Sequence, residues 1–436
     1  MQKELINTAQ EKEKTVLVCF SVKGDSKHYH PEDSLDELKF LAETAGADVI
    51  KTFYQQRDSF DSAFLIGKGK AQEIADYVDS HGVKLVIFEN ELGYSQLRNL
   101  EQKIKCKIID KSNLILDIFA GNARTAQAKL QVELAQLEYL LPRLTRQWTH
   151  LSKQYGGIGT KGPGETQIET DRRMIRTRIS SLKEKLRKID TQAKTQSAER
   201  KNYFRISLVG YTNVGKSTLL NTLTNADVYV ENKLFATLDT STRTLKLSDV
   251  KTHGETKFPK KVLISDTVGF IKNLPHGLIE SFKSTLSEVI DSDVLLHVID
   301  ISNPHYEEQI ETVEDTLKQI GADKKPVIRV YNKVDNFHDP ELFALIKEKY
   351  PKSVFISAEK GVNVLAVIEM IKDILTSSNK IRTLDIPVGD YKRLSEIYES
   401  AEVHGVEYFD DKIEVKLRTN KENFTRLAKQ KTKQDQ

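Results

Sequence analysis

Thiols are scarce in this chain of 436 residues, which contains only Cys19 and Cys106. Two distant cysteines exclude a disulfide-rich fold and lack the spacing of a zinc site, so they favour a reducing compartment. Long apolar runs are missing too, and the polar start MQKELINTAQEKEK lacks the apolar stretch of a signal peptide. We expect a monomeric, cytoplasmic protein that does not insert into membranes, with peripheral membrane association left open.

An excess of one charge is also lacking, because 66 Lys and Arg residues nearly balance 63 Asp and Glu residues, for a net charge of +3. The overall charge therefore does not indicate nucleic-acid binding, which must be argued from local clusters. The chain is long enough for roughly three domains. Its hydrophobic content of 39% is sufficient for folded cores.

The first 120 residues alternate between strand and helix patterns. Apolar strands are predicted at 15–22, 48–55 and 83–90, with helices at 34–47 and 71–82 between them. Ser34 is a typical helix N-cap, and Gly82 a typical residue after a helix end. Strands joined by helices predict a small parallel α/β domain over residues 1–120.

Residues 121–200 show a coiled-coil pattern interrupted by a glycine-rich tip at 155–166. Apolar residues recur mostly at alternating spacings of four and three, at Leu130, Leu134, Leu137, Leu141, Leu144, Trp148 and Leu151, and then at Ile168, Ile175, Ile179, Leu182, Leu186 and Ile189. Two such seams can bury their apolar stripes by folding back on each other, which predicts an antiparallel helical hairpin. Pro142 should kink its first helix.

Residues 201–377 begin with a phosphate-binding motif. The buried strand YFRISLV leads into GYTNVGKS at 210–217, and a helix with one apolar face follows. This is the context of a P-loop in a doubly wound α/β domain. Loop N–H groups would bind phosphate oxygens, Lys216 would reach the β- and γ-phosphates, and the Ser217 hydroxyl would ligate Mg²⁺. The flanking strand and helix argue against a chance match in a glycine turn.

The choice of base depends on Asn332, Lys333 and Asp335, which follow another apolar strand. Guanine presents two adjacent donors that one carboxylate can accept, whereas adenine has an acceptor at N1, so Asp335 would select guanine. An isolated N-K-x-D is more often a strand-end turn. Here, however, the motif lies between a P-loop and the segment that ends at Ser357 and Ala358. The N–H groups of these two residues can face guanine O6, so the arrangement favours a guanine site.

The segment VLISDTVGF supplies two further site residues. Asp266 is expected to hold Mg²⁺ through a water, and the Gly269 N–H to sense the γ-phosphate. Thr237 and Thr240 are both candidates for the switch threonine that joins Mg²⁺ only with GTP. Phe270 stands where familiar GTPases place a Gln, so we expect slow hydrolysis that needs a partner or a cation. Alternatively, Phe270 merely packs and another side chain positions the water.

Residues 378–436 have a β-α-β-β-α pattern that predicts a small α+β domain. The chain as a whole is thus expected to be a multidomain α/β protein. Its four parts are the parallel N-terminal domain, the hairpin, the P-loop domain and this last domain.

Taken together, the motifs resemble a known family. GYTNVGKS, FATLD, DTVGF, NKVD and SAEKG, with the hairpin and its YGGIGTKGPGETQ tip, look like HflX, a bacterial family of translation-linked GTPases. The resemblance covers nearly the whole chain. It implies Thr237 as the switch threonine, a hydrophobic residue at Phe270, and Asn213 as a K⁺ ligand. It also implies binding to the rRNA and proteins of the large ribosomal subunit, stimulation by that subunit, and ribosome dissociation under stress.

The expected site residues follow from the motifs and this resemblance. The nucleotide-binding set is Gly210, Tyr211, Thr212, Asn213, Val214, Gly215, Lys216, Ser217, Thr218, Phe235, Ala236, Thr237, Leu238, Asp239, Asp266, Thr267, Val268, Gly269, Asn332, Lys333, Val334, Asp335, Ser357, Ala358 and Glu359. The catalytic group is Lys216, Thr237, Asp266 and Gly269. The expected metal ligands are Ser217 and Thr237 for Mg²⁺, and Asn213 for K⁺.

Basic residues gather towards the hairpin tip. Such a column of cations is an electrostatic footprint for phosphates, and glycines would let the tip backbone approach RNA closely. The expected RNA contacts are Arg143, Arg146, Lys153, Tyr155, Gly156, Gly157, Lys161, Gly162, Arg172, Arg173 and Arg176. The alternative is a solvated helix face with i,i+4 ion pairs, because Glu165, Glu169 and Asp171 lie nearby. The glycine tip and the resemblance favour RNA.

Two other functions stay open on the residues alone. One is a GTP-gated enzyme that modifies tRNA or remodels RNA, although the first domain shows no cysteine nucleophile motif and no clear cofactor loop. The other is a GTP-loaded scaffold that recruits proteins through the coiled-coil seam. The sequence does not decide whether the N-terminal domain holds a second nucleotide.

Overall fold

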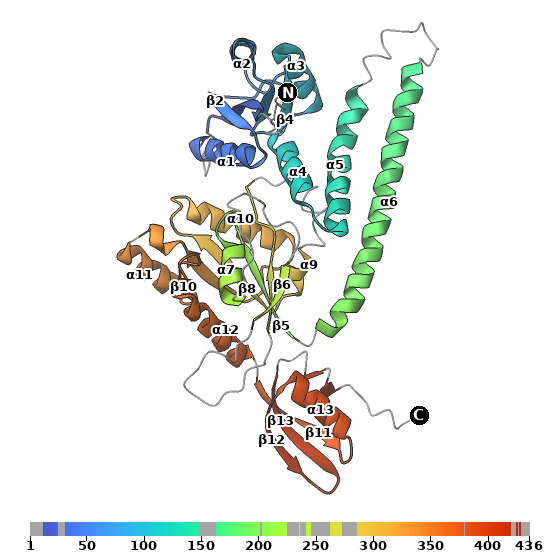
Figure 1. Cartoon of the computed structure of the whole chain (residues 1–436), viewed down its shortest axis with the longest axis vertical. Helices are drawn as coiled ribbons and strands as arrows, with labels where there is room; N and C mark the ends of the chain where they lie inside the picture. Colours follow the sequence, from blue (N-terminus) through green and yellow to red (C-terminus); the bar gives the residue numbers. More distant parts are fainter. Residues whose placement is uncertain are drawn as a thin grey trace, which may run out of the picture. The chain divides into compact units, whose positions relative to one another are not determined.

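The fold was analysed in a computed structural model of the chain (Figure 1). The structure describes residues 12–24, 31–147, 163–200, 203–224, 235, 241–245, 262–272, 286–337, 339–378, 380–419, 424–425 and 427–428. Residue contacts divide the chain into two compact units. The first contains the N-terminal sheet and most of the helical hairpin, and the second contains the other two sheets.

The N-terminal sheet is parallel, as predicted, and it has a fourth strand that the sequence pattern did not reveal. Its strands lie in the order β2-β1-β3-β4. The elements are β1 (Lys14–Val22), α1 (Pro31–Thr44), β2 (Asp48–Arg57), α2 (Lys68–His81), β3 (Leu85–Phe88), α3 (Tyr94–Ile104), β4 (Lys107–Asp110) and α4 (Lys111–Asn122). The strand β4 is short, with only three buried residues, so its apolar signal is weak.

The first helix begins earlier than its predicted cap. Helix α1 starts at Pro31, followed by Glu32 and Asp33 in the first turn. Proline fits the first helical position because its missing N–H would have no intrahelical partner, and acidic residues favour the helix N-terminus. Ser34 therefore lies inside the helix, where it is buried, and the prediction that it caps the helix is wrong.

The hairpin consists of α5 (Ala126–Gln147) and α6 (Pro163–Arg200), which lie side by side (Figure 1). The predicted seam is confirmed over the part described, since the hairpin core is formed by Leu134, Ile179, Leu182 and Leu186, flanked by Leu130, Leu137, Leu141 and Ile175. Residues 163–166 of the predicted tip are helical and belong to α6. Trp148 and residues 155–162 lie outside the described residues.

A buried carboxylate attaches the hairpin to the N-terminal sheet. Asp110 is 1% exposed; it ends β4 and caps α4 by accepting the Asn113 N–H. From α5 it accepts the Tyr139 hydroxyl at 2.6 Å and the Arg143 guanidinium at 3.1 Å. The Arg143 guanidinium also stacks on the Tyr139 ring, 3.4 Å from its centroid. A buried carboxylate with several charge-assisted donors fixes one helix firmly against another.

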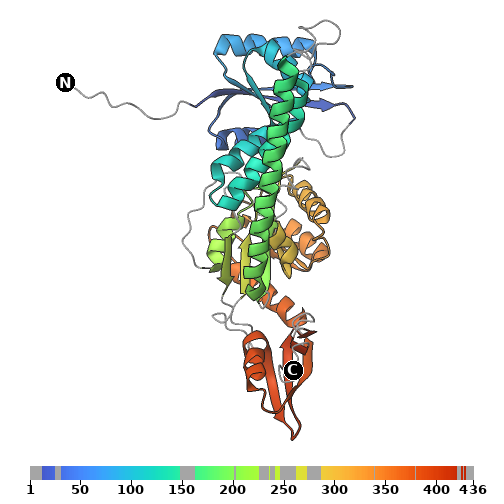
Figure 2. The ribbon, with the colours of Figure 1, turned by 90° about the vertical axis from the view of Figure 1, so that its right-hand side faces the viewer.

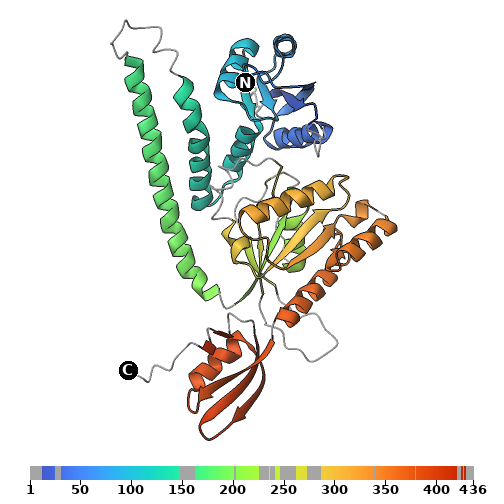
Figure 3. The ribbon, with the colours of Figure 1, turned by 180° about the vertical axis from the view of Figure 1, so that it is seen from behind.

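The second unit contains a six-stranded sheet with helices beside it (Figure 3), in the order β10-β9-β8-β5-β7-β6. Among the strands described in this sheet, β6 alone runs antiparallel to its neighbour, β7. The elements are β5 (Phe204–Gly210), α7 (Lys216–Thr224), β6 (Ser241–Leu245), β7 (Val262–Asp266), α9 (Ser287–Asp291), β8 (Val294–Asp300), α10 (Tyr306–Gln319), β9 (Val327–Asn332), α11 (Pro340–Lys349), β10 (Ser353–Phe355) and α12 (Val364–Ser378). Both the P-loop and the N-K-x-D motif follow the carboxyl ends of parallel strands.

A small antiparallel sheet with one helix beside it forms the last part of the chain (Figure 2). Its strands lie in the order β11-β13-β12, and its elements are β11 (Lys380–Pro387), α13 (Tyr391–Ser400), β12 (Glu402–Tyr408) and β13 (Lys412–Thr419). This matches the predicted β-α-β-β order. The final predicted helix lies mostly outside the described residues. Within the part of the chain that is described, no helix is both long and apolar enough to cross a membrane.

The hydrogen bond from Tyr139 to Asp110 predicts a measurable loss of stability when the Tyr139 hydroxyl is removed. Tyr139→Phe removes a donor to the carboxylate without creating a cavity. We expect the free energy of unfolding to fall by about 1–2 kcal/mol, because a hydrogen bond to a buried charged group is lost. Urea titration of the full chain measures it. Tyr77→Phe in α2 is the matched control, since its hydroxyl has no hydrogen-bond partner among the described residues; equal changes in both variants would contradict the prediction.

Candidate nucleotide-binding site

The P-loop connects β5 to α7 in a turn that requires glycine. Gly210 and Gly215 have φ angles of +155° and +94°. A Cβ on Gly210 would lie 2.3 Å from the Val298 carbonyl oxygen, and one on Gly215 would lie 2.4 Å from Nδ2 of Asn332. Larger residues would collide at both positions. The loop therefore has the tight backbone that phosphate binding needs.

Lys216 is held inside this loop. Its side chain is buried, and its ammonium donates to the carbonyls of Gly210 at 3.1 Å and Tyr211 at 2.7 Å. Burial lowers the pKa of Lys216 to about 8, while the nearby Asp266 carboxylate acts in the opposite direction. The Lys216 ammonium is thus fixed in position by two carbonyl groups. A bound phosphate would place negative charge beside it.

Two hard oxygen ligands meet beside the loop. The Ser217 hydroxyl donates to Oδ2 of Asp266 at 2.5 Å, and Asp266 is buried at the end of β7. A hydroxyl and a carboxylate are the donors that Mg²⁺ prefers in phosphate sites, so these two residues fit the ion that P-loop GTPases use. Among the described residues, no cluster of three or more His, Cys, Asp or Glu suggests another metal centre.

The loop after Asp266 is bonded to the P-loop along its backbone. The Phe270 N–H donates to the Gly210 carbonyl at 3.1 Å, and the Thr212 N–H donates to the Phe270 carbonyl at 2.9 Å. The Lys272 N–H donates to the Tyr211 hydroxyl at 2.9 Å. Phe270 is buried at 3% exposure. Gly269 is therefore placed next to the P-loop, while the Phe270 side chain has no hydrogen-bonding group.

Asn332 joins the phosphate and base ends of the site. Its buried side chain donates to the Val214 carbonyl at 2.8 Å and accepts the Ala358 N–H at 2.9 Å. The Ser357 N–H donates to the Val362 carbonyl at 3.1 Å. Both N–H groups that we expected at guanine O6 are thus used inside the protein. Their contact with guanine O6 stays a prediction.

Asp335 lies beside these residues as a charged acceptor. The Ser357 hydroxyl bonds to its carboxylate, and Lys360 pairs with Oδ2 at 3.3 Å; together they lower the pKa of Asp335. It is therefore ionised and able to accept two donors at once. Lys333 pairs with Asp300 at 2.7 Å. The predicted site residues did not include Asp300, nor Lys360, although Lys360 lies within the SAEKG motif.

The remaining predicted nucleotide residues differ in their surroundings. Asn213 is exposed with φ +60°, and Glu359 is also exposed. Residues buried around the loops are Thr212, Val214, Thr267 and Val268, and those partly buried are Thr218 and Val334. Ala236, Thr237, Leu238 and Asp239 lie outside the described residues.

Phe235 packs against α4 within the first unit. Its ring packs edge-on against Phe119 with centroids 4.7 Å apart, and its carbonyl accepts the Asn122 side-chain amide at 2.9 Å. Phe235 is 3% exposed and has a φ of +55°, which is uncommon for a bulky residue and persists only where surrounding contacts hold it. The ring of this predicted nucleotide residue is thus used for packing at the end of α4.

The predicted RNA-binding arginines have unlike environments on the hairpin. Arg143 is engaged with Asp110 and half-buried, Arg172 is partly buried, and Arg173 and Arg176 are exposed. Arg146 belongs to α5. Lys153, Tyr155, Gly156, Gly157, Lys161 and Gly162 lie outside the described residues.

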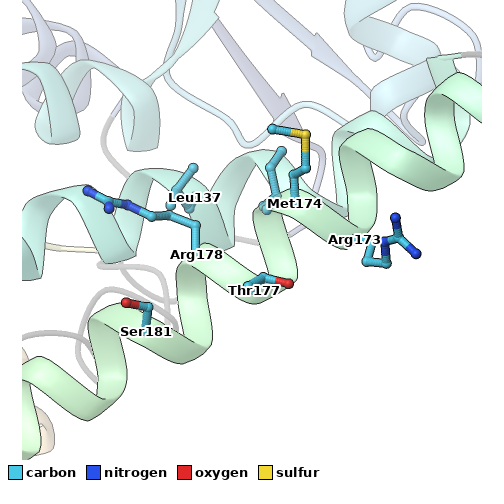
Figure 4. Close-up of a pocket in the computed structure, with 7 residues that line it drawn as sticks. Leu137, Arg173, Met174, Thr177, Arg178 and Ser181 are labelled. Atoms are coloured by element: carbon cyan, nitrogen blue, oxygen red, sulfur yellow. The ribbon is translucent and has the colours of Figure 1, made fainter.

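Part of the hairpin charge is paired between its helices. Arg178 pairs with Glu133 at 2.6 Å, and Lys183 pairs with Glu138 at 2.8 Å. An open groove of about 580 Å³ runs along α6 beside Leu137 (Figure 4). Arg173 and Met174 line it, and Met174 is 64% exposed. The face is thus a mixture of cations, an exposed thioether and apolar seam residues.

A phosphate-binding loop, a magnesium-type oxygen pair and a carboxylate suited to guanine, on this mostly parallel sheet, define a P-loop GTPase. Family models match consecutive parts of the chain. They are described as GTP-binding GTPase N-terminal at residues 32–120, GTP-binding GTPase Middle Region at 122–200, and 50S ribosome-binding GTPase at 205–333. These matches and the curated GTPase HflX relatives show that the chain belongs to the HflX family of GTPases.

Curated relatives match almost end to end. GTPase HflX of Flavobacterium psychrophilum is 44% identical over 91% of this chain and 93% of its own length. GTPase HflX of Escherichia coli is 40% identical over 91% of this chain and 92% of its own length. Among solved structures, a GTP-binding protein of the archaeon Sulfolobus solfataricus in complex with GDP aligns over 83% of this chain and 98% of its own, at 25% identity and a TM-score of 0.45.

The pKa of Lys216 predicts how nucleotide affinity depends on pH. Bound phosphates favour the charged ammonium, so they raise the pKa of Lys216 above its value of about 8. Binding should then take up about half a proton at pH 8, and affinity should fall by up to about tenfold per pH unit above pH 8. Below that pH, Lys216 contributes no pH dependence.

Calorimetry in two buffers of different ionisation enthalpy, from pH 7 to 9.5, measures this proton uptake directly. Lys216→Met provides the reference, because it removes the titrating group. Proton uptake that is absent near pH 8, or that persists unchanged in Lys216→Met, would contradict the assignment.

Proposed function

We propose that this chain is a GTP-hydrolysing switch that binds the large ribosomal subunit and dissociates ribosomes under stress. The family model over residues 205–333 is described as a 50S ribosome-binding GTPase, and the relatives carry the HflX name. The observation that carries the proposal is the combination of a guanine-type P-loop site with exposed arginines on a long helical hairpin. Ribosomal RNA is a dense array of phosphates that such arginines fit.

In this proposal each motif acts on one part of the nucleotide. Lys216 and the loop N–H groups bind the phosphates, and Asp335 accepts the two donors of guanine. Ser217 and Thr237 would bind Mg²⁺ directly, and Asp266 would hold it through a water. The ion would neutralise the phosphate charge. Gly269 contributes an N–H to the γ-phosphate.

GTP would act by shifting a population of conformations. With the γ-phosphate present, the segment around Thr237 and the loop after Asp266 become ordered on the nucleotide. The N-terminal sheet and hairpin respond as one body, because Asp110 fixes α5 to β4. Phe235 lies two residues before Thr237, and its contacts with Phe119 connect the switch segment to α4.

Hydrolysis by the isolated chain is expected to be slow. Phe270 is buried and cannot orient a water, so the rate should depend on the large subunit. Asn213, exposed on the P-loop, is the proposed K⁺ ligand. A potassium ion there would add positive charge beside the phosphates.

On the hairpin, the proposed RNA contacts are centred on Arg173 and Arg176. Both are exposed, and no ion pair joins either of them to another residue in the described part of the chain. Arg172, on the same helix, is partly buried, and we propose Arg146 and the predicted tip residues between 153 and 162 as further RNA contacts on the basis of the sequence. Arg143 is better explained by its ion pair with Asp110.

The first test is GTP turnover by the full chain with and without large ribosomal subunits, in potassium and in sodium buffer. We expect turnover to rise at least about tenfold with large subunits and to be higher in potassium. Small subunits serve as the control for non-specific RNA effects. Equal turnover with either subunit, or fast turnover by the chain alone, would refute the proposed dependence on the large subunit.

The second test addresses the hairpin. Arg173→Gln with Arg176→Gln should weaken binding to large subunits and lower the slope of log affinity against log salt by about 0.7–0.9 per lost phosphate contact. GTP affinity should not change. Lys188→Gln is the matched control, because Lys188 is exposed on the same helix but lies far from the tip. Unchanged binding by the double variant would remove this face from the interface.

A further inference from the structure

One hydroxyl in the P-loop has no role in the site described so far. Thr212 is 6% exposed, and its Oγ1 is buried without a hydrogen-bond partner among the residues that the structure describes. Buried hydroxyl groups in folded proteins nearly always have a partner. An unpaired one beside a phosphate site therefore points to a ligand or a water that completes it.

Thr212 lies against Gly269, which is expected to contact the γ-phosphate. A Cβ on Gly269 would lie 2.8 Å from Thr212 Cγ2, 2.9 Å from its Cα and 3.1 Å from the Lys216 ammonium. The Thr212 N–H donates to the Phe270 carbonyl, which fixes its backbone. Oγ1 shares its Cβ with the methyl group that faces Gly269, so the hydroxyl belongs to a side chain that lies against the Gly269 backbone.

The neighbouring hydroxyl groups are already engaged. Ser217 donates to Asp266, and Thr267 donates to the Leu208 carbonyl at 2.6 Å. The Tyr211 hydroxyl accepts the Lys272 N–H. Of these four hydroxyl groups, that of Thr212 is the one with no hydrogen-bond partner among the described residues.

We propose that Thr212 is the side chain that orients the attacking water during GTP hydrolysis, in the role that Phe270 cannot fill. This inference rests on the proposed GTP site, because it needs the γ-phosphate to lie between Lys216 and Gly269. A threonine hydroxyl suits the role, since it accepts one hydrogen bond and donates another.

In the proposed step, the water donates a hydrogen bond to Thr212 Oγ1, whose own hydrogen points to a γ-phosphate oxygen. The water oxygen forms a bond to the γ-phosphorus. The bond from that phosphorus to the bridging oxygen breaks, and its electron pair leaves with GDP. The proton of the water passes to a phosphate oxygen, which yields inorganic phosphate. Thr212 stays neutral, so its contribution is orientation.

Two substitutions separate the hydroxyl from the shape of the side chain. Thr212→Val keeps the shape and removes the hydroxyl, whereas Thr212→Ser keeps the hydroxyl and removes the methyl group. The full chain is assayed for single-turnover GTP hydrolysis and for its GTP dissociation constant, alone and with saturating large subunits. Thr244→Val, at an exposed position on β6, is the control for valine substitution.

We expect hydrolysis by Thr212→Val to fall about 10- to 100-fold, the size of effect that loss of orientation produces. Its GTP dissociation constant should stay within about twofold of the wild type, because the loss is confined to the transition state. Thr212→Ser should recover the rate to within about threefold, since it restores the same hydrogen bonds. Thr244→Val should behave as the wild type.

Three results would overturn the proposal. They are wild-type turnover by Thr212→Val, turnover by Thr212→Ser as slow as that of Thr212→Val, and a loss of GTP affinity as large as the loss of rate. If large subunits fail to stimulate the wild type, the proposed function fails instead. The comparison of basal turnover among the variants still tests Thr212 in that case.

Discussion

The side-chain amide of Asn332 is the interaction on which the nucleotide site depends. It donates to the P-loop at Val214 and accepts from Ala358, so it holds together the two loops proposed to bind the phosphates and the base. Gly215 has no side chain because a Cβ there would collide with this amide. The phosphate loop and the base loop are therefore fixed against each other by hydrogen bonds within the protein.

Much of this arrangement is predictable from local pattern, and the exceptions have a common cause. The P-loop, the N-K-x-D motif and the hairpin seam are short or periodic, so spacing alone reveals them. The partner of Arg143 and the use of the Ala358 N–H depend on residues distant in the chain, Asp110 and Asn332 respectively. Nothing in their local sequence encodes those partners. Ser34 shows a different limit, because its typical N-cap character was outweighed by Pro31, at which the helix starts.

The hairpin shows how one charge pattern can serve two purposes. Arg178 and Lys183 pair with acidic residues of α5, whereas the ion-pair interpretation of the sequence expected pairs within one helix. Arg173 and Arg176 are exposed on the same helix and fit the RNA interpretation. A sequence pattern gives only the number and spacing of cations. Which of them is satisfied internally depends on the facing residue of the other helix, and that requires the helix register.

The location of the Asp110 cluster has a consequence for mechanical coupling. Its carboxylate is buried, so dissolved ions cannot surround it, whereas the Arg178–Glu133 pair is about half exposed and is weakened by ionic strength. The joint between hairpin and sheet should therefore stay stiff in buffers that loosen the contacts between α5 and α6. A force on the hairpin would be transmitted to the N-terminal strands under all of these conditions.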